Sequence, residues 1–406
     1  MYEGEFKDDN FVEKGKLYRH NGQYYIGQYK NNKMEGEGTL FNEDDTISYY
    51  GTFVDNKKNG EGKLFFKDGN YYIGPFKDDK MDGEGTIYDK DRNIIYNGYF
   101  RNDLKEGEGN LIFDGYQYVG FFKNDLFHGK GILSKKDEEN GKVFEYDGDF
   151  VNGLKEGEGK LIIDDVTYKG SFKNDKKNGK GQIYLKDEKD LIYNGDFVDD
   201  KYEGKGKLKL ENDYYYEGEF KNGKKNGEGV IYDKENKIIY EGHFVDDLKE
   251  GDNEKAMLED GGYYFGQFKN GKKHGNGIEY DKDNQVIYEG EYVNDKKEGK
   301  GILFYDERKL YYKGEFKNDE FNGKGEIYLV EEGKEYFKLV DGHFTDGKLD
   351  GKAKFYDKDG DFKEAEMEDD KQVGEALTFL KKNGALPFID IVKGKIDEIK
   401  EKCIIF

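Results

Sequence analysis

One spacing recurs along most of the chain: a tyrosine is followed 11 residues later by a glycine, from the second copy onward. The tyrosine opens a Tyr-x-Gly-x-(Phe/Tyr) segment, and the glycine opens a Gly-x-Gly segment. All variation in repeat length, from 22 to 28 residues, falls between the Gly-x-Gly segment and the next tyrosine. A constant part joined by variable parts is typical of stacked supersecondary units with surface loops of free length. The fourteen opening tyrosines are Tyr2, Tyr25, Tyr49, Tyr72, Tyr96, Tyr118, Tyr146, Tyr168, Tyr193, Tyr216, Tyr240, Tyr264, Tyr288 and Tyr312.

Each repeat has the residue pattern of a β-hairpin. Successive side chains of a strand point to opposite faces, so Tyr25, Gly27 and Tyr29 share one face, as do Gly36 and Gly38. Polar, turn-forming residues separate the two half-motifs. Glycine weakens a strand and usually marks the close approach of another group. We therefore expect aromatic rings from neighbouring strands to lie across the glycines.

The succession Tyr-x-Gly-x-(Phe/Tyr), a short polar turn and Gly-x-Gly-x-(Leu/Ile) resembles the MORN repeat family. Residues 1–356 carry this pattern in about 15 tandem copies, the last of which begins at Val340. The resemblance implies an all-β fold, an elongated open antiparallel sheet of tandem MORN β-hairpins. It also implies a role in membrane–cytoskeleton linkage or in the organisation of cortical structures.

Three copies depart from the pattern. One has Asn253 and Lys255 where a glycine and an aliphatic residue are expected, the next has Glu279 at the aliphatic position, and the last has Val340 and Ala353. Irregular end copies are expected of caps. The departure at Asn253 to Lys255 marks either a kink or a docking point.

A second period, of two repeats, is superimposed at the residue that follows each Phe or Tyr of the first motif. This residue is mostly lysine in even copies and valine in many odd copies, and it lies on the strand face opposite to Tyr, Gly and Phe. Duplication of a two-hairpin ancestor explains the alternation, and so does a valine stripe that docks a partner at every second hairpin. The valines are Val54, Val151, Val198, Val245 and Val293.

Composition favours a repeat array over a globule with a thick core. Of the 406 residues, 38% are charged and 34% hydrophobic, which is close to the disordered range, yet 35 Tyr and 30 Phe exceed what disordered chains carry. Fifteen hairpins with strands about 4.8 Å apart span roughly 140 Å before twist shortens the array. We expect a long, thin MORN array at residues 1–356, followed by an acidic linker at residues 357–370.

The formal net charge of −22 argues against nucleic acid as a partner and, averaged over the array, against an anionic bilayer. Lysine-rich turns such as Lys57-Lys58 and Lys272-Lys273 alternate with acids, and we interpret them as a solvated edge that blocks strand-to-strand aggregation. The sequence has one cysteine, no N-terminal apolar stretch and no apolar run of 18 residues. These features predict a cytoplasmic protein without an internal disulfide.

The sequence predicts no catalytic, metal or cofactor site. Five histidines are scattered without a pair at metal-ligand spacing, and a single cysteine excludes a Cys/His zinc site. The Gly-x-Gly segments never complete G-x-G-x-x-G or open a helix. Asp357 to Glu368 superficially copies a calcium loop, but Phe362 stands where the sharp turn needs glycine. We therefore expect a protein that is not an enzyme and binds no cofactor.

Near the C-terminus the hydrophobic period becomes helical. Val373, Ala376, Leu377 and Leu380 follow the spacing i, i+3, i+4, i+7, and a second, weaker apolar stripe comes after them. We predict a short C-terminal α-helical tail at residues 371–402, which covers the last hairpin or lies along the sheet. A helix that binds a partner is the alternative.

The chain ends in Cys403-Ile404-Ile405-Phe406, the only cysteine followed by two aliphatic residues and a phenylalanine. This ending, residues 403–406, fits the C-a-a-X prenylation signal, and Phe at the last position favours a geranylgeranyl group. We therefore predict lipidation at Cys403 and peripheral attachment to the cytosolic face of a membrane.

The function that these features favour is a non-enzymatic scaffold or adaptor. The MORN array is tethered by its prenylated tail and links a membrane to cytoskeletal or signalling proteins. One alternative is direct phospholipid binding by the array, and another is an aromatic-repeat module that binds a ligand. The lack of tryptophan and of a secretion signal argues against the second alternative. A homo-oligomer would add lipid anchors and so strengthen attachment.

Overall fold

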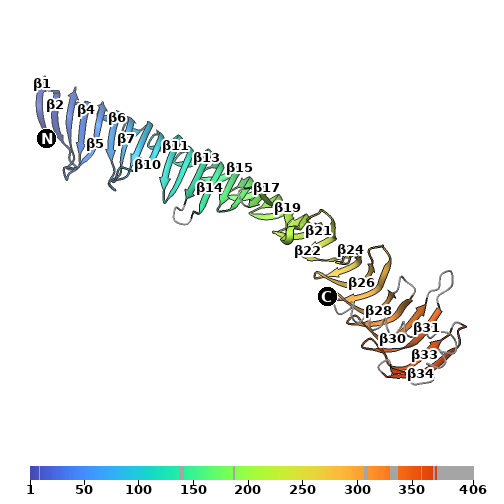
Figure 1. Cartoon of the computed structure of the whole chain (residues 1–406). Coiled ribbons are helices and arrows are strands. Elements are labelled where there is room, and N and C mark those ends of the chain that lie inside the picture. The colour runs from blue at the N-terminus through green and yellow to red at the C-terminus, as the bar shows by residue number, and fades with distance from the viewer. Residues whose placement is uncertain are drawn as a thin grey trace. The chain divides into compact units, whose positions relative to one another are not determined.

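The computed structural model describes residues 1–8, 10–136, 141–185, 188–305, 310–329, 337–357, 359–368 and 371–372. The chain divides into two compact units, Met1–Tyr202 and Glu203–Phe406. Each unit is one layer of antiparallel strands, and the strands follow one another in the order of the sequence (Figure 1). The predicted all-β architecture is confirmed. The described residues contain one short 3₁₀ turn, η1 (Glu211–Asp213), besides the strands.

The strands up to the unit boundary are β1 (Tyr2–Lys7), β2 (Asn10–Tyr18), β3 (Tyr24–Lys30), β4 (Lys33–Phe41), β5 (Ile47–Val54), β6 (Lys57–Phe65), β7 (Tyr71–Lys77), β8 (Lys80–Met81), β9 (Gly83–Tyr88), β10 (Ile94–Arg101), β11 (Leu104–Phe113), β12 (Tyr116–Lys123), β13 (Leu126–Lys136), β14 (Val143–Val151), β15 (Leu154–Ile163), β16 (Val166–Lys173), β17 (Lys176–Leu185) and β18 (Asp190–Val198).

The strands from the boundary onward are β19 (Lys201–Lys209), β20 (Tyr215–Lys221), β21 (Lys224–Tyr232), β22 (Ile238–Val245), β23 (Leu248–Lys249), β24 (Gly251–Met257), β25 (Tyr263–Lys269), β26 (Lys272–Tyr280), β27 (Val286–Val293), β28 (Lys296–Tyr305), β29 (Leu310–Lys317), β30 (Glu320–Leu329), β31 (Phe337–Thr345), β32 (Lys348–Leu349), β33 (Gly351–Tyr356), β34 (Phe362–Glu368) and β35 (Lys371–Gln372).

A two-residue turn joins the two long strands of a repeat at most of the turns that the structure describes. Between β5 and β6, Asp55 and Asn56 have φ of 50° and 70°, in the left-handed region. Asn, Asp and Gly tolerate this region best, which explains why these types fill the turns. The same backbone occurs at Asn31–Asn32, Asp78–Asp79, Asn102–Asp103, Asn124–Asp125, Asn174–Asp175, Asp246–Asp247, Asn294–Asp295 and Asn318–Asp319.

The second turn residue also binds the preceding hairpin. The backbone N–H of Asp79 donates to the carbonyl of Lys58 at 3.0 Å, and the N–H of Lys58 donates to Asp79 Oδ1 at 2.9 Å. Asn56 and Met34 exchange the same two bonds, at 3.1 and 2.8 Å. The turns therefore form a ladder of their own beside the sheet. A turn residue with an acceptor side chain can make both bonds, whereas glycine can make only the backbone bond.

The glycines of neighbouring strands lie side by side. Gly51 of β5 faces Gly62 of β6, and the register then shifts so that Phe53 faces Lys58. On its other side, Gly62 faces Gly74 of β7. A row of glycine backbone therefore runs across the strands.

Tyrosine rings cover this glycine row on one face of the sheet, here called the ring face. A Cβ added to Gly62 would lie 2.3 Å from the hydroxyl oxygen of Tyr49, so only glycine leaves room for the ring. The Tyr49 hydroxyl donates to the carbonyl of Thr52 at 3.2 Å. The ring makes edge-to-face contacts with Phe53 of its own strand and Phe76 of the next repeat, at 5.2 and 5.0 Å. Such aromatic pairs stabilise beyond the area that they bury.

The contacts repeat from hairpin to hairpin and form a continuous ladder of rings within each unit. The expectation that rings lie across the glycines is thus confirmed, and the ladder is the core of the sheet. Its fully buried side chains are Tyr25, Tyr49, Tyr72, Tyr96, Tyr118, Tyr146, Tyr168, Tyr193, Tyr216, Tyr240, Tyr264 and Tyr288.

The lysine-rich turns divide between two environments. Lys57 is exposed and pairs with Asp78 at 3.0 Å, as the solvated-edge interpretation expects. Its neighbour Lys58 instead turns onto the ring face, where its ammonium lies 5.3 Å from the centre of the Tyr49 ring. Burial lowers the pKa of Lys58. The second lysine of the turn therefore covers the outer side of the ring ladder. There its aliphatic chain packs on the rings and its ammonium makes a cation–π contact.

A one-residue bulge shifts the motif in the irregular copy of the second unit. The register of β24 slips before Glu254, which then faces Gly266 and so takes the place of the second glycine. Ala256 takes the aliphatic position. The prediction that Asn253 and Lys255 fill these two places is therefore wrong, because the bulge moves both places on by one residue.

The Glu254 carboxylate is buried on the ring face, with 7% of the residue exposed. It accepts the backbone N–H of His243 at 2.9 Å and lies 3.5 Å from the hydroxyl of Tyr240. Burial raises the pKa of this carboxyl. The Glu254 side chain thus fills part of the space that a glycine in this place would leave for the tyrosine ring.

Glu279 does occupy the aliphatic position predicted for it, opposite Tyr264 and Tyr288. It is buried, and its carboxylate lies 2.6 Å from Lys273 Nζ and 3.7 Å from Lys297 Nζ. Burial opposes ionisation, but the two ammonium groups outweigh it and lower the pKa of Glu279. Two lysines of the outer cover therefore make a buried carboxylate tolerable in the core.

The sheet extends beyond the boundary predicted at residue 356. β34 lies within residues 357–370, assigned above to an acidic linker, and pairs in register with β33. Met367 is buried opposite Gly351 of β33, whereas Phe362, opposite Tyr356, is 50% exposed. β35 takes the first two residues of the predicted tail. Residues 373–406, with the rest of the predicted helix and Cys403, lie outside the described residues.

Candidate binding groove

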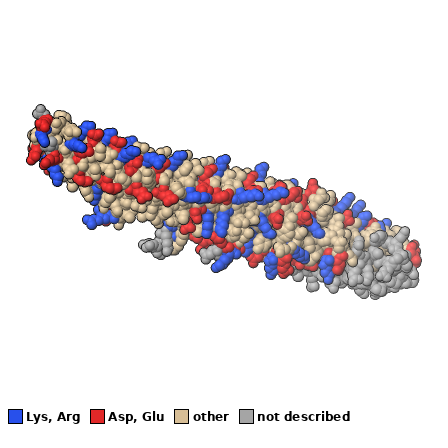
Figure 2. Space-filling model, turned by 90° about the horizontal axis from the view of Figure 1, so that it is seen from above, with Lys and Arg blue, Asp and Glu red and all other residues tan. Residues whose placement is uncertain are grey.

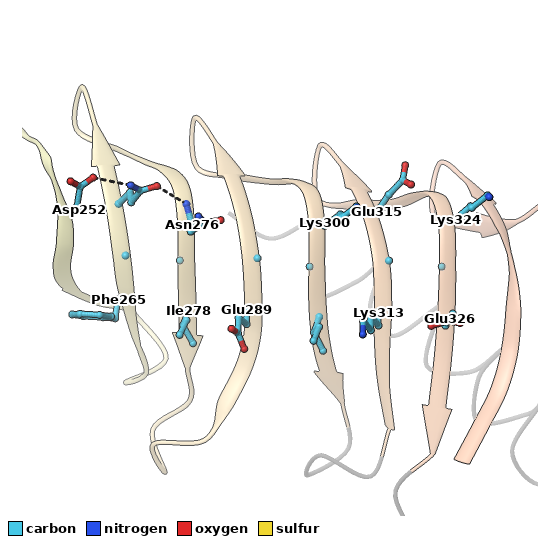
Figure 3. A pocket seen from close by; sticks show the side chains of 18 of the residues that line it. Asp252, Phe265, Asn276, Ile278, Glu289, Lys300, Lys313, Glu315, Lys324 and Glu326 are labelled. Atoms are coloured by element: carbon cyan, nitrogen blue, oxygen red, sulfur yellow. Dashed lines mark hydrogen bonds between the residues drawn. The ribbon is translucent and has the colours of Figure 1, made fainter. Parts of the chain in front are cut away.

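The face opposite the tyrosine rings, here called the open face, forms a groove in the second unit. Side chains from β24 to β31 line it and enclose about 930 Å³ (Figure 3). The lining residues come from the variable positions of the repeat, between and beside the glycines. They stand in two rows with glycine Cα atoms between them, as Figure 3 shows for Asn276, Lys300 and Lys324 on one side and Ile278, Glu289 and Glu326 on the other.

Glycines make the floor of this groove. Gly290 and Gly301 face each other in neighbouring strands. A Cβ on either would point toward Tyr288 on the ring face, at 2.4 and 2.5 Å from its hydroxyl oxygen. The open side of these glycines is therefore bare backbone. A ligand can approach this backbone more closely than a strand that carries side chains.

One row of the groove carries an apolar patch. Phe265 and Ile278 face each other in β25 and β26, and Phe265 is 40% exposed. Ile302 of β28 lies in the same row and faces Glu289. Apolar side chains grouped on an exposed surface mark interaction sites more often than isolated ones do.

The charges of the groove are mixed. Three lysines, Lys300, Lys313 and Lys324, and five carboxylates line it. Within the described residues none of these lysines forms an ion pair. Glu326, by contrast, pairs with Lys338 and accepts the Tyr328 hydroxyl at 2.8 Å. The remaining carboxylates of the groove are Asp252, Glu289, Glu315 and Asp341.

The electrostatics of Glu326 follow from these contacts. Burial opposes its ionisation, but hydrogen bonds from Lys338 and Tyr328 outweigh burial and lower its pKa. The carboxylate is therefore charged at neutral pH and occupied by its own neighbours. The three lysines are the side chains that the groove leaves free to bind an acidic group of a partner.

The turn-side end of the groove is held by a short hydrogen-bond chain. Gln267 Nε2 donates to Asp252 Oδ1 at 2.8 Å, and the backbone N–H of Asn276 donates to Gln267 Oε1 at 2.8 Å (Figure 3). Three consecutive strands are linked in this way. The bonds fix the shape of this end before any ligand binds.

The valines of the two-repeat period lie on the open face near the turns. Val54, Val151 and Val293 are 44–45% exposed. Val151 faces Leu154 across its hairpin, and Leu154 is also exposed. The stripe is thus accessible, and both explanations of its origin remain predictions.

Other candidate chemistry is scarce in the part of the chain that the structure describes. No three His, Cys, Asp or Glu side chains there are placed to hold a metal ion. No described helix is long and apolar enough to cross a membrane. The predicted lipidation residue, Cys403, lies outside the described residues.

Of the groove residues, only Asn253 was singled out in the sequence, within the departure interpreted as a kink or a docking point. The others were missed because their identities vary from repeat to repeat. The signal that locates them is parity: each stands one position from a motif glycine and therefore on the opposite face from the tyrosine. That rule places all the variable positions on one surface. It does not show where along the array the surface becomes a groove.

Comparison with known proteins identifies the repeat. The sequence profile of the family described as MORN repeat matches fifteen segments, at residues 2–24, 25–45, 49–71, 72–94, 96–115, 118–138, 146–165, 168–187, 193–213, 216–235, 240–251, 264–286, 288–306, 312–329 and 341–362. No curated protein matches the chain.

Two of the solved structures that match the chain have low sequence identity and a low TM-score. One is titled "Crystal structure of the eukaryotic initiation factor"; it has 8% identity and a TM-score of 0.14, covering 80% of this chain and 87% of that one. The other is Kluyveromyces lactis Hsv2, with 7% identity and a TM-score of 0.14, covering 80% and 96%. Likeness at this level carries no argument about function.

Proposed function

Because the chain belongs to the MORN repeat family, we propose that it is a non-enzymatic scaffold whose second-unit groove binds a segment of a partner protein. The observation that carries this proposal is the groove itself. A bare glycine floor lies between one row that carries the apolar patch and Lys313 and a second row that carries Lys300 and Lys324, and none of the three lysines forms an ion pair with a described residue. Groups of these kinds match the backbone, the apolar side chains and the carboxylates of a polypeptide.

The size and polarity of the groove support a protein segment over a small molecule. Its volume of about 930 Å³ is near the upper end for small-ligand pockets, which are mostly apolar and enclosed. This groove is open along several strands, and charges of both signs line it. Mixed charge and exposed backbone suit a partner that brings its own hydrogen-bond donors and acceptors.

The proposed scaffold is held at the cytosolic face of a membrane by prenylation of Cys403. The ending Cys403-Ile404-Ile405-Phe406 supports this part of the proposal. A partner bound in the groove would then be linked to the membrane, as expected of an adaptor to cytoskeletal or signalling proteins. We expect Cys403→Ser to move the full-length protein from the membrane fraction to the soluble fraction of a cell lysate. A serine variant that stays in the membrane fraction would contradict the lipid tether.

Direct binding of phospholipid by the groove is the second candidate. Lys300, Lys313 and Lys324 favour it because phosphate groups attract unpaired ammonium groups. The five carboxylates of the same groove oppose it, since the lining charge is three positive against five negative. Cosedimentation with vesicles containing phosphatidylserine tests this candidate. Binding that Lys313→Glu abolishes would favour the lipid over the protein segment.

Site-directed photocrosslinking tests the protein-binding proposal. A photoreactive phenylalanine at position 278, in the groove, should capture a defined partner in cells. The same residue at Asp283, in the exposed loop before β27, is the control. We expect Ile302→Lys to abolish capture from position 278, because it places a charge in the apolar patch. Lysine occupies the equivalent position in β6 and β15, so the sheet tolerates the substitution.

Equal capture from positions 278 and 283 would show that contact is not made in the groove. Capture that persists in Ile302→Lys would exclude the apolar patch as the binding surface. Either result would contradict the proposal.

A further inference from the structure

A second surface, with different chemistry from the groove, lies on the open face of the first unit. Four consecutive Gly-x-Gly segments have glutamate at the centre: Glu37 in β4, Glu61 in β6, Glu84 in β9 and Glu108 in β11. These four are here called the acidic row. None of them faces a basic residue across the strands. The cross-strand neighbours are Thr52 for Glu37, Pro75 for Glu61, Tyr99 for Glu84 and Phe121 for Glu108.

The charge of the acidic row is not neutralised from within the sheet. None of the four glutamates forms an ion pair among the residues that the structure describes. The row ends at the next repeat, where Lys130 replaces glutamate and pairs with Asp149 at 2.9 Å. On the face that Figure 2 views, charges of both signs are interspersed. Basic side chains also stand on the open face nearer the turns, two residues beyond the cross-strand neighbours of three of the glutamates: Lys77 after Pro75, Arg101 after Tyr99 and Lys123 after Phe121. The acidic row is therefore a line of carboxylates without ion pairs, with basic side chains on its turn side.

Lys63 is the one basic side chain between the glycine row and the outer edge of the open face from β3 to β12. Its ammonium lies 3.8 Å from the centre of the Tyr71 ring and 4.7 Å from that of Phe65. These contacts hold it at the outer edge, away from the acidic row. The Lys63 ammonium is stabilised there by cation–π contacts instead of an ion pair.

An apolar row accompanies the acidic row across the glycines. Ile26, Tyr50, Ile73 and Val119, each between the tyrosine and glycine of its repeat, are 43%, 52%, 43% and 47% exposed. Polar residues interrupt this row, with Lys63 between Tyr50 and Ile73 and Asn97 in the repeat before Val119. Val119 also faces Ile132, which is 41% exposed. Exposed apolar side chains in a line, beside unpaired carboxylates, form a surface whose complement is apolar and basic.

The spacing of the acidic row selects the conformation of that complement. Consecutive glutamates are two strands apart, which is about 9.6 Å. A polyproline II helix repeats every three residues and about 9.3 Å, so a basic residue at every third position stays in step with the row. An α-helix brings a residue back to the same face after seven residues and about 10.5 Å. Its mismatch with the spacing of the glutamates is therefore about 0.9 Å per repeat, against about 0.3 Å for polyproline II.

We infer that the open face of the first unit binds an extended, basic segment of a partner protein, with Lys or Arg at every third position and proline or other apolar residues between. The basic side chains pair with Glu37, Glu61, Glu84 and Glu108, and the apolar residues lie on the apolar row. A segment already in the polyproline II conformation loses little entropy on binding. This surface is separate from the groove, so the inference does not depend on the proposed function.

Binding of synthetic peptides to the full-length protein tests the inference. The probe is a fluorescent 15-residue peptide with the sequence Lys-Pro-Pro repeated five times. The matched control has the same composition with its five lysines adjacent. We expect the regular peptide to bind at least about tenfold more tightly, because only its charges are in step with the row. Equal affinity of the two peptides would show that they bind only through the negative charge of the protein as a whole. This result would overturn the inference.

A charge-reversal variant tests the site. Glu61→Lys with Glu84→Lys should weaken binding of the regular peptide by about tenfold or more. Lysine occurs at the same motif position in β13 and β17, so the sheet accepts it. The control, Glu43→Lys with Asp91→Lys, makes the same change of net charge in exposed loops and should alter affinity less than about twofold.

Two further outcomes would contradict the inference. Unchanged affinity in the Glu61→Lys, Glu84→Lys variant, with thermal unfolding as in the parent protein, would remove the acidic row as the site. Tighter binding of an α-helical peptide with lysine at every seventh position would remove the extended conformation. Ile302→Lys in the groove should leave peptide affinity unchanged, which separates this test from that of the proposed function.

Discussion

The ring faces of the two units solve the same packing problem with different residues. In the first unit, no described carboxylate is buried beneath the ring ladder, and the glycine pairs and aliphatic residues follow the motif from the second copy onward. In the first copy, exposed Glu13 stands in the first glycine place. In the second unit, Glu254 stands in a glycine place and Glu279 in an aliphatic place, both buried. The ladder persists in both units, with edge-to-face contacts of 5.0–5.3 Å around Tyr49 and Tyr288.

The comparison shows what the motif requires and what it allows. From Tyr25 to Tyr312 it keeps a tyrosine ring over backbone with partner rings beside it, whereas the last copy has Val340 in that place. It allows a carboxylate in the core where a partner is supplied, either a backbone N–H, as for Glu254, or two lysines, as for Glu279. Conservation of the ring contacts, rather than of each motif letter, therefore defines the structural core.

The largest predicted effect separates two adjacent tyrosines. Tyr49→Ala removes a fully buried ring and should destabilise the first unit by about 3–5 kcal/mol. Tyr50→Ala is the control, because Tyr50 is 52% exposed on the open face, and should cost less than about 0.5 kcal/mol. The free energy of unfolding of each variant is measured by urea titration, with hydrogen exchange of residues 47–65 as the local probe. Similar losses in the two variants would refute the division into two faces.

A smaller effect is expected at the glycine row. Gly62→Ala places a Cβ 2.3 Å from the Tyr49 hydroxyl oxygen and must displace the ring, at a cost of about 1–3 kcal/mol. The neighbouring substitution Glu61→Ala points to the open face and should be close to neutral. The same unfolding measurement applies. A neutral Gly62→Ala would mean that the tyrosine does not depend on the absence of a side chain.

The buried ion cluster gives the next effect. Glu279→Gln leaves Lys273 and Lys297 without their carboxylate and should destabilise the second unit by about 1–2 kcal/mol. Glu279→Leu restores the aliphatic residue of the motif and should cost less than the glutamine variant, since apolar replacements of buried charges are often neutral or stabilising. Thermal unfolding of both variants at pH 7 checks this order. A leucine variant less stable than the glutamine variant would show that the cluster contributes more than an apolar contact.

The smallest effect is a pH dependence at Glu254. Burial raises the pKa of its carboxyl above the ordinary value of about 4.3, so the folded protein holds this proton more tightly than the unfolded chain. The associated stability is complete below that ordinary value and is lost as the pH rises through the raised pKa. Glu254→Gln keeps an oxygen for the His243 N–H and does not titrate. Its melting temperature relative to the parent should therefore be higher at pH 7 than at pH 4, and an unchanged difference would refute the assignment.

Much of the fold follows from the sequence because the motif is local. The 11-residue spacing predicts hairpins, and the parity of Tyr, Gly and Phe predicts which face is buried. The bulge before Glu254 could not be predicted, because a shift of one residue depends on the pairing of β24 with β25. The role of Lys58 was also hidden, since its exposed neighbour Lys57 has the same type and the two differ only in the face to which they point.

The candidate surfaces were harder to predict than the core. The groove gathers Phe265, Ile278 and Ile302 from three strands, and each alone resembles ordinary variation between the glycines. Their grouping is visible only once the strands are placed side by side in register. The acidic row, in contrast, can be read from four Glu at one motif position, although its lack of ion pairs cannot.

The central claim is that the ring face holds the sheet together and the open face binds partners. Photocrosslinking from position 278 tests this claim most directly when it is compared between two variants, Gly301→Ala and Ile302→Lys, which change neighbouring residues of one repeat. The comparison is made at a temperature below the melting temperature of either variant. Gly301→Ala, whose Cβ would lie 2.5 Å from the Tyr288 hydroxyl oxygen, should lower the melting temperature and retain crosslinking. Ile302→Lys should keep the melting temperature and lose crosslinking. A folded Ile302→Lys variant that still crosslinks, or a Gly301→Ala variant that is fully stable yet loses its partner, would contradict the claim.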